Sequence, residues 1–338
     1  MPPVSERAPK MNEADVAIRL TRVTKTFGMK NAVDDLSLVI KAGSVFGLIG
    51  PNGAGKTTTF SMMAGYLKPS SGDLTILGFA PDQVESLRGQ LGVLPQDALL
   101  PANDLVGEFL TDMAQLQGFP KDKAGTLARE TLEEVQGQTW WRMRCGALSH
   151  GMAKRVQLAQ ALLGNPKVVL LDEPTAGLDP RIAYEVRQII KGRKGSCTLV
   201  VSSHNLTELE EVCDSAAVLD RGRLVASGTM SELTAATEEV RFKVPPLSET
   251  PAPSALAQDP NAKPPMAGIR ELPMVTLASY EDDRGELVVH FDRTKPEVDA
   301  ENVIGAVLWV LLQHRVRISG VTKGRGLEQR VMDLTDHA

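Results

Sequence analysis

The chain has 338 residues, of which 42% are hydrophobic and 23% charged, as is usual for a soluble globular protein of one or two domains. Its formal net charge of −5 argues against non-specific nucleic-acid binding as the main activity, because such binding needs clustered positive charge to displace phosphate counterions. Three cysteines without a CxxC pair argue against a disulfide framework and fit a reducing compartment.

Neither the N-terminal segment nor the longest apolar run predicts membrane insertion. The first ten residues, MPPVSERAPK, are polar and proline-rich and lack the apolar region of a secretory signal. The run VIGAVLWVLL at 303–312 is half as long as a bilayer-spanning helix, which takes about 20 residues, so we expect the buried face of a helix there. We therefore expect an N-terminal tail at 1–15 and a soluble chain that reaches a membrane only through a partner.

Three segments follow the tail. Residues 16–244 alternate apolar strand-like runs with helical patterns, which is typical of parallel α/β sheets. Residues 245–273 are rich in proline, alanine and serine and lack periodicity, so we expect a linker that cannot bury enough surface to offset its ordering entropy. Residues 274–338 predict a small α+β subdomain, to which the run at 240–244 could add a strand. Within it we expect strands at 274–280, 286–292 and 316–321 and helices at 298–314 and 326–334.

The strongest motif is GPNGAGKT at 50–57, which fits the phosphate-binding pattern G-x-x-x-x-G-K-[ST] in full. An apolar strand-like run precedes it and a helical pattern follows it, as a P-loop requires. Its glycines let backbone N–H groups point at phosphate oxygens, and the following helix N-terminus adds a dipole that favours anions. We expect Lys56 to reach the β- and γ-phosphates and the Thr57 hydroxyl to bind Mg²⁺.

A second motif, VVLLDEP at 168–174, reads as a buried strand that ends in two acids. Asp172 then lies at the carboxyl edge of the sheet, where doubly wound sheets bind ligands, and its carboxylate suits Mg²⁺ coordination. Glu173 suits general-base work on an attacking water, or its polarisation. Without a P-loop upstream, a strand end followed by a solvated turn would explain the motif equally well.

The remaining motifs are weak when each is taken alone. Gln96 and His204 each follow an apolar run, AGLDP at 176–180 reads as a turn, and LSHGM at 148–152 opens a helix that Ser149 can cap. Their order along the chain, together with the P-loop and VVLLDEP, is what makes them informative. In that order residues 16–235 resemble the nucleotide-binding subunit of an ABC transporter. The resemblance implies a P-loop ATPase core with a helical subdomain at about 97–163, followed here by the small α+β subdomain.

The resemblance implies a role for each matching residue. Phe27 would stack on adenine, where the family more often has tyrosine, and Val33 would line the base. Gln96 resembles the Q-loop glutamine, which touches Mg²⁺ or water and senses the transmembrane partner, and His204 resembles the switch histidine at the γ-phosphate. The implied ATP contacts are Phe27, Val33, Gly50, Pro51, Asn52, Gly53, Ala54, Gly55, Lys56, Thr57, Thr58, Ser149, Gly151 and the D-loop residue Asp179. The implied catalytic residues are Glu173, His204, Gln96 and Lys56, and the implied Mg²⁺ ligands are Thr57, Gln96 and Asp172.

The chain departs from the family in its signature motif, which is usually LSGGQ. His150 replaces the first glycine and Met152 the glutamine, whereas Ser149 and Gly151, which would face the ATP of an opposite subunit, are kept. Such variants occur among exporter subunits, and GLEQRVMDLT at 326–335 resembles the closing helix of drug- and polysaccharide-type exporter ATPases. The tryptophans at 140 and 141 match no family role, so we expect them to pack in the helical subdomain.

We therefore expect an ATPase at the cytoplasmic face of a membrane that works as a homodimer and powers export through a separate permease, which would select the substrate. The alternative is a soluble ABC ATPase of translation or DNA repair. The translation type usually carries two cores in one chain, and the chromosome type has a long coiled coil between P-loop and signature, for which this chain lacks room. In a third reading the C-terminal subdomain senses a ligand, which is compatible with export.

Overall fold

The computed structural model describes residues 15–235, 239–245, 265–281, 284–292, 298–323 and 331. The chain divides into two compact units, Met1–Met230 and Ser231–Ala338, each with its own hydrophobic core. Three predicted features lie outside the described residues: residues 1–14 of the tail predicted at 1–15, residues 246–264 of the predicted linker, and the predicted closing helix apart from residue 331.

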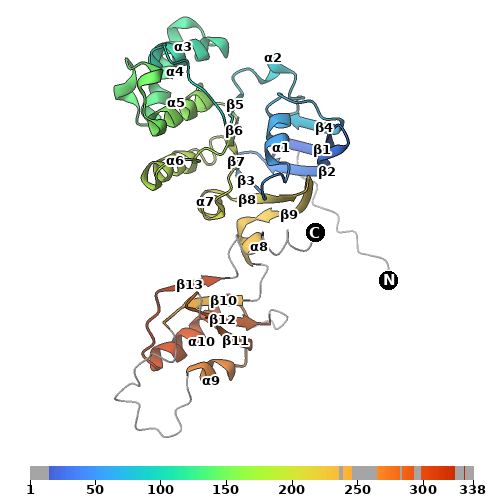
Figure 1. Cartoon of the computed structure of the whole chain (residues 1–338), viewed down its shortest axis with the longest axis vertical. Helices are drawn as coiled ribbons and strands as arrows, with labels where there is room; N and C mark the ends of the chain where they lie inside the picture. The colour runs from blue at the N-terminus through green and yellow to red at the C-terminus, as the bar shows by residue number, and fades with distance from the viewer. Residues whose placement is uncertain are drawn as a thin grey trace. The chain divides into compact units, whose positions relative to one another are not determined.

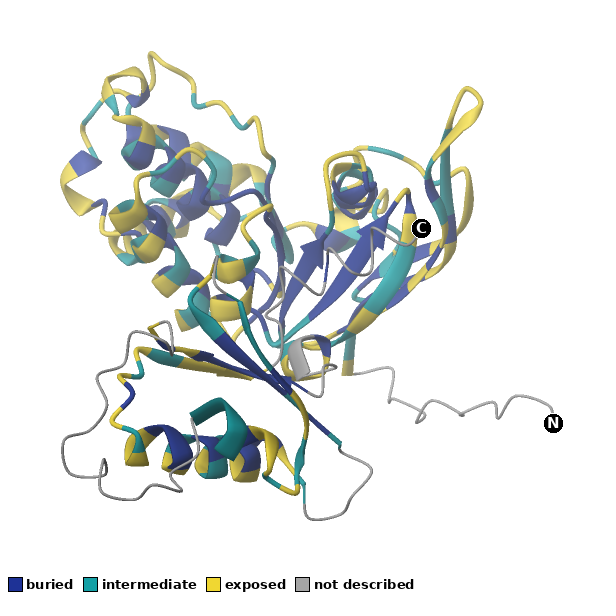
Figure 2. Cartoon of the chain, turned by 60° about the horizontal axis from the view of Figure 1, so that its bottom comes forward, coloured by how far each residue is buried: buried dark blue, intermediate teal, exposed yellow. Residues whose placement is uncertain are grey.

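A six-stranded sheet forms the centre of the first unit (Figure 1). Its strand order is β5 (Leu91–Leu94), β6 (Val168–Asp172), β7 (Thr198–Ser202), β3 (Val45–Ile49), β8 (Ser215–Asp220) and β9 (Arg223–Thr229). Neighbouring strands are parallel except β8 and β9, which form an antiparallel pair. Every residue of β3, β6 and β7 is buried, as expected of central strands covered on both faces (Figure 2). The carboxyl ends of these three neighbours meet at one edge of the sheet.

A second, antiparallel sheet has the order β2 (Lys30–Lys41), β1 (Val16–Phe27) and β4 (Ser71–Ile76). One core cluster joins this sheet, helix α1 (Lys56–Met63) and the strands β3, β6, β7 and β8. Because α1 buries Phe60, Met62 and Met63 in this cluster, the loop that leads into the helix is fixed relative to the central sheet.

The helices α3 (Val106–Leu116), α4 (Lys121–Glu134) and α5 (His150–Leu162) pack on one another and fall between residues 97 and 163. Trp140 is buried beneath the Arg155 guanidinium, 5.0 Å from the ring centroid. The Trp141 ring lies so close to Gly107 that a Cβ there would be 2.3 Å from it. Both tryptophans therefore pack as expected. The short α2 (Val84–Leu87) precedes β5, and α6 (Pro180–Gly192) and α7 (Leu206–Val212) follow β6 and β7.

The second unit is a four-stranded antiparallel sheet with a helix packed against it. The strand order is β11 (Val275–Glu281), β12 (Glu286–Phe291), β10 (Glu239–Lys243) and β13 (Gly320–Lys323). Its core cluster combines β10 to β12 with α10 (Ala300–Gln313) and Ile269 of α9 (Pro265–Arg270). The short α8 (Met230–Ala235) lies where the two units divide. No helix in the described ranges is both long and apolar enough to cross a membrane.

The structure differs from the expected boundaries at three places. The second unit starts before residue 244, because β10 pairs with β12 and β13. The helix α9 lies inside the predicted linker and buries Ile269 in the second core. The last strand begins at Gly320 instead of 316. Val316 lies just after the end of α10, where its N–H donates to the Leu311 carbonyl.

Candidate active site

A pocket of about 570 Å³ brings together motifs that are far apart in the sequence. It lies where β3, β6 and β7 end, and it is lined by P-loop residues, by Gln96 shortly after β5 and by the two acids at the end of β6. The residues that line it are Lys30, Ala32, Asn52, Gly53, Gly55, Lys56, Thr57, Thr58, Gln96, Asp172, Glu173, Ala176 and His204. Every residue predicted to be catalytic or to bind Mg²⁺ is therefore in one pocket.

The P-loop owes its shape to glycines that no other residue could replace without strain. Gly55, just before α1, has φ +99°, and a Cβ there would be 2.5 Å from the Ala32 carbonyl oxygen. Gly50 has φ +154°, and its Cβ would be 2.2 Å from the Leu219 carbonyl oxygen. The loop thus wraps tightly between β2 and β8, so that its backbone, rather than side chains such as the buried Ala54, is what a ligand would meet.

Lys56 is buried although it is charged. Its Nζ donates to the carbonyl oxygens of Gly50, at 2.6 Å, and of Pro51, at 3.1 Å, so it closes the loop on itself. Burial lowers the pKa of the Lys56 ammonium, and the negative charges of Glu173 and Asp172 oppose that shift. The lysine therefore supplies a desolvated positive charge at the floor of the pocket.

Asp172 and Glu173 are both buried, and Ser202 at the end of β7 forms a hydrogen bond with each of them. The Ser202 hydroxyl donates to Asp172 Oδ1, while the Glu173 N–H donates to Ser202 Oγ at 3.0 Å. Burial raises the pKa of the Asp172 carboxyl, and the Ser202 hydrogen bond and the charge of Lys56 oppose that shift. Glu173 has a left-handed backbone with φ +50°, which costs about 1 kcal/mol in a residue with a Cβ. Backbone strain of this kind is typical of functional sites, where the backbone conformation sets the direction of a side chain.

His204 meets Glu173 across the pocket. Its Nδ1 lies 2.9 Å from Glu173 Oε2, and its side chain is 67% exposed whereas that of Glu173 is 12% exposed. His204 also lines the pocket. A carboxylate aimed by a histidine next to a P-loop can act on a water molecule that attacks a bound phosphate.

Two predicted adenine contacts do not line the pocket. Phe27 is half exposed at the end of β1, with Lys25 Nζ 5.3 Å from its ring centroid. Val33 is fully buried in the core, contrary to the expectation that it lines the base. Residues alternate along β2, so its neighbour Ala32 faces the pocket instead, as does Lys30. Val33 is out of phase with the buried Leu36 and Leu38, because Asp35 has φ +53° and the pairing of β2 with β1 shifts its register there, so simple alternation could not have corrected the prediction.

Ser149, Gly151 and Asp179 lie outside the pocket of their own chain. Ser149 caps α5 by accepting a hydrogen bond from the Met152 N–H at 3.3 Å. Asp179 caps α6 by accepting from the N–H groups of Arg181 and Ile182, both at 3.1 Å. Gly151 packs against α6, where a Cβ would be 2.5 Å from Ile182 Cδ1.

Lys154 was not among the predicted residues. It lies on α5 and is 6% exposed, and burial lowers its pKa while the charges of Asp172, Glu173 and Asp97 oppose that shift. Its position three residues after the buried Gly151 places it on the inner face of the helix, which was the available signal.

A matched pair of glycine variants tests the P-loop. Gly53 has φ +83°, and no heavy atom lies within 4 Å of a Cβ added there. In Gly53→Ala only the left-handed backbone is then unfavourable, so we expect the free energy of unfolding to fall by about 1 kcal/mol. In Gly55→Ala the contact with the Ala32 carbonyl adds to that penalty, and we expect a loss of about 3 kcal/mol. Denaturant unfolding without nucleotide measures both. Equal losses would mean that the loop moves away from Ala32 at no cost.

Comparisons with known proteins find relatives of this chain. A family model described as "ABC transporter" matches residues 33–176. The chain is 36% identical over 224 residues to the Nod factor export ATP-binding protein I of Rhizobium johnstonii, covering 65% of this chain and 72% of that protein. It is 31% identical to the linearmycin resistance ATP-binding protein LnrL of Bacillus subtilis, covering 64% of this chain and 70% of that one.

Among solved structures, cbiO1 from Clostridium perfringens, part of the ABC transporter complex cbiONQ, is similar to this chain. It is 28% identical, with a TM-score of 0.58 over 65% of this chain and 90% of its own. The expected α/β P-loop ATPase fold is therefore confirmed. By its fold and its relatives, the chain belongs to the ABC transporter family, as a protein that binds and hydrolyses ATP.

Proposed function

We propose that the chain is the ATP-hydrolysing subunit of a membrane exporter and acts through a separate transmembrane permease. The main support for ATP hydrolysis is the 2.9 Å contact between Glu173 and His204 in the same pocket as the P-loop. The export part is supported by the relatives, one named for Nod factor export and one for linearmycin resistance.

In the proposed reaction the P-loop N–H groups and Lys56 bind the phosphates of ATP. Glu173 accepts a proton from the attacking water, or polarises it, and His204 holds the Glu173 carboxylate in place and contacts the γ-phosphate. The buried position of Glu173 supports this role, because a carboxylate with few water neighbours keeps one orientation. Half-exposed Phe27 offers its ring to the adenine.

The pocket also suits Mg²⁺. Thr57, Gln96 and Asp172 offer a hydroxyl, an amide and a carboxylate oxygen in the same pocket, and Mg²⁺ is usually held by one or two carboxylates together with substrate phosphates. When bound, the ion would supply positive charge that neutralises the phosphate oxygens. The Ser202 hydroxyl donates to Asp172 Oδ1 and so orients the carboxylate that would bind the ion.

We propose further that two copies of the chain face each other head to tail. ATP would then lie between the P-loop of one copy and Ser149 and Gly151 of the other. The exposed position of the Ser149 cap, outside the pocket of its own chain, supports this arrangement. Closure of the dimer would move the permease, which would dock near residues 96–100, where Leu99 is 91% exposed. We therefore propose that the protein works at the cytoplasmic face of a membrane.

A pull-down from native membranes tests the exporter. Tagged Glu173→Gln protein, incubated with ATP, should hold the closed dimer on its partner and recover a polytopic membrane protein. The Lys56→Met variant serves as the control, because it should not bind ATP and should recover less of the same partner. Recovery of ribosomes or DNA-repair proteins alone would contradict the exporter and favour the soluble ATPase.

A further inference from the structure

Glu208 on α7 joins two segments that carry the active site. The Thr175 hydroxyl donates to Glu208 Oε2 at 2.6 Å, and Arg187 Nη1 on α6 donates to Glu208 Oε1 at 2.9 Å. We call these three residues the Glu208 bridge. They are largely buried: Thr175 is 8% exposed, and the side chains of Arg187 and Glu208 are 15% and 18% exposed.

The Glu208 bridge runs beside the contact between Glu173 and His204. Thr175 comes two residues after Glu173, and Glu208 comes four residues after His204. The same two segments are therefore joined twice, once by the Glu173–His204 contact at 2.9 Å and once by the Thr175–Glu208 hydrogen bond at 2.6 Å. The second link does not face the pocket, since neither Thr175 nor Glu208 lines it.

The geometry points to Glu208 and Arg187 as positioning residues, which fix the distance between Glu173 and His204. The inference rests on the proposed roles of those two residues. Charge-assisted hydrogen bonds are short and directional, and the β-branched threonine has few rotamers, so the bridge restricts where both segments can lie.

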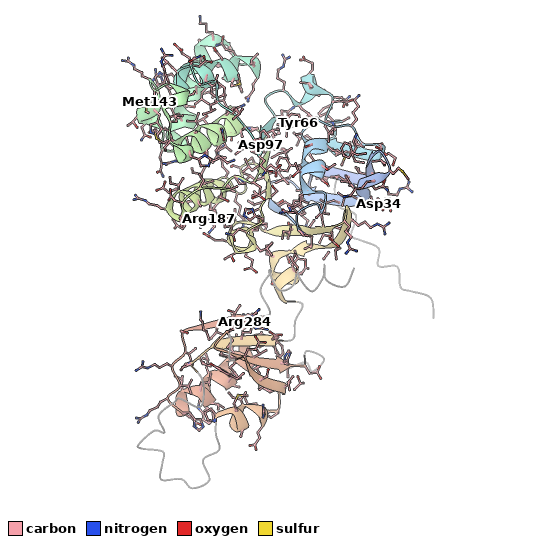
Figure 3. All side chains as sticks on the ribbon, in the orientation of Figure 1. Asp34, Tyr66, Asp97, Met143, Arg187 and Arg284 are labelled. Carbon is pink, nitrogen blue, oxygen red and sulfur yellow. The ribbon has the colours of Figure 1, made fainter. Side chains whose placement is uncertain are left out.

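Arg187, labelled in Figure 3, also bonds a second carboxylate on α7. Its Nε donates to Glu211 Oε2 at 2.8 Å, so one guanidinium holds α7 at two neighbouring carboxylates and prevents the helix from rotating about its axis. The backbone N–H of Glu208 is itself held by Asn205 Oδ1, at 3.3 Å, in the residue that follows His204. A misplacement of about 1 Å can cost a catalytic group much of its effect.

Thr175 offers the cleanest test in the purified full-length chain. Thr175→Val removes the hydroxyl and keeps the shape, and we expect kcat for ATP hydrolysis to fall about tenfold, part of what a general base contributes, with KM changed less than about twofold. Thr175→Ser keeps the hydroxyl and should keep kcat. Glu208→Ala should match Thr175→Val, whereas Thr207→Val, which removes a hydroxyl from an exposed position on the same helix, should retain most of the activity.

The decisive measurement repeats Thr175→Val in a His204→Ala background. If the bridge acts through the Glu173–His204 pair, the second substitution should lower kcat less than about twofold, because contacts that act as one unit are not additive. The same tenfold loss in both backgrounds, an effect on KM instead of kcat, or an equal loss in Thr207→Val would overturn the inference. If His204→Ala alone left kcat unchanged, the proposed role of His204 would be wrong, and so would the positioning role of the Glu208 bridge. If the native chain did not hydrolyse ATP, the proposed function itself would be wrong.

Discussion

Replacing Glu173 with glutamine should lower the rate constant of ATP hydrolysis by between about a hundredfold and about ten-thousandfold, the usual contribution of a general base. The amide cannot accept the proton, yet it has the same shape and can still bond His204 Nδ1, 2.9 Å from Glu173 Oε2 in the native chain. ATP affinity should therefore stay within about threefold of that of the native protein. Single-turnover kinetics measure the first quantity and equilibrium titration with a fluorescent ATP analogue the second.

A matched control separates catalysis from charge. Glu133→Gln removes the same charge from an exposed position on α4 and should leave the rate constant unchanged. If Glu173→Gln retained more than a tenth of the native rate constant, the general base would have to be sought elsewhere, and loss of ATP binding would instead assign Glu173 to the binding step.

Replacing Lys56 with methionine should weaken ATP binding by about a hundredfold or more, because the phosphates would then lie in a buried site without its cation. The melting temperature without nucleotide should change little. Methionine removes a buried charge, whose lowered pKa shows that burial disfavours it, but it also removes two hydrogen bonds to the Gly50 and Pro51 carbonyls. These contributions to the free energy of unfolding have opposite signs.

Thermal unfolding with and without ATP checks this prediction in one experiment. ATP should raise the melting temperature of the native chain and not that of Lys56→Met, because only a ligand that binds the folded state stabilises it. Lys68→Met is the control, since Lys68 is a surface residue paired with Asp82. An equal rise in both chains would show that the backbone of the P-loop binds phosphate without the lysine.

The parts that could be predicted from the sequence are those whose geometry is local. The P-loop needs a strand, a glycine-rich turn and a helix in direct succession, and all three are legible in residues 45–63. The order of the motifs led to the family, which is confirmed. The position of Val33 depends on which face of β2 is buried, and a one-residue shift along a strand exchanges the faces.

The features that could not be predicted depend on contacts between distant segments. The sequence left open whether the run at 240–244 adds a strand to the second unit, because that depends on its pairing with β12 and β13, which lie far along the chain. The hydrogen bond between Thr175 and Glu208 spans 33 positions, and nothing in either local sequence indicates the other residue. Side-chain pairings of this kind become visible only when helices are placed beside each other.

The strand order of the central sheet also bears on how the protein is made. β3, which leads into the P-loop, is hydrogen-bonded on both edges to strands from the far end of the first unit, β7 and β8. A ribosome therefore completes the phosphate-binding motif long before it delivers the strands that hold it. Until residue 202 has emerged, β3 has neither neighbour, and it lacks the second until residue 220 has emerged. Its apolar residues meanwhile form an unpaired strand edge that chaperones can cover. Nucleotide can stabilise the cassette only as one of the last events of its synthesis.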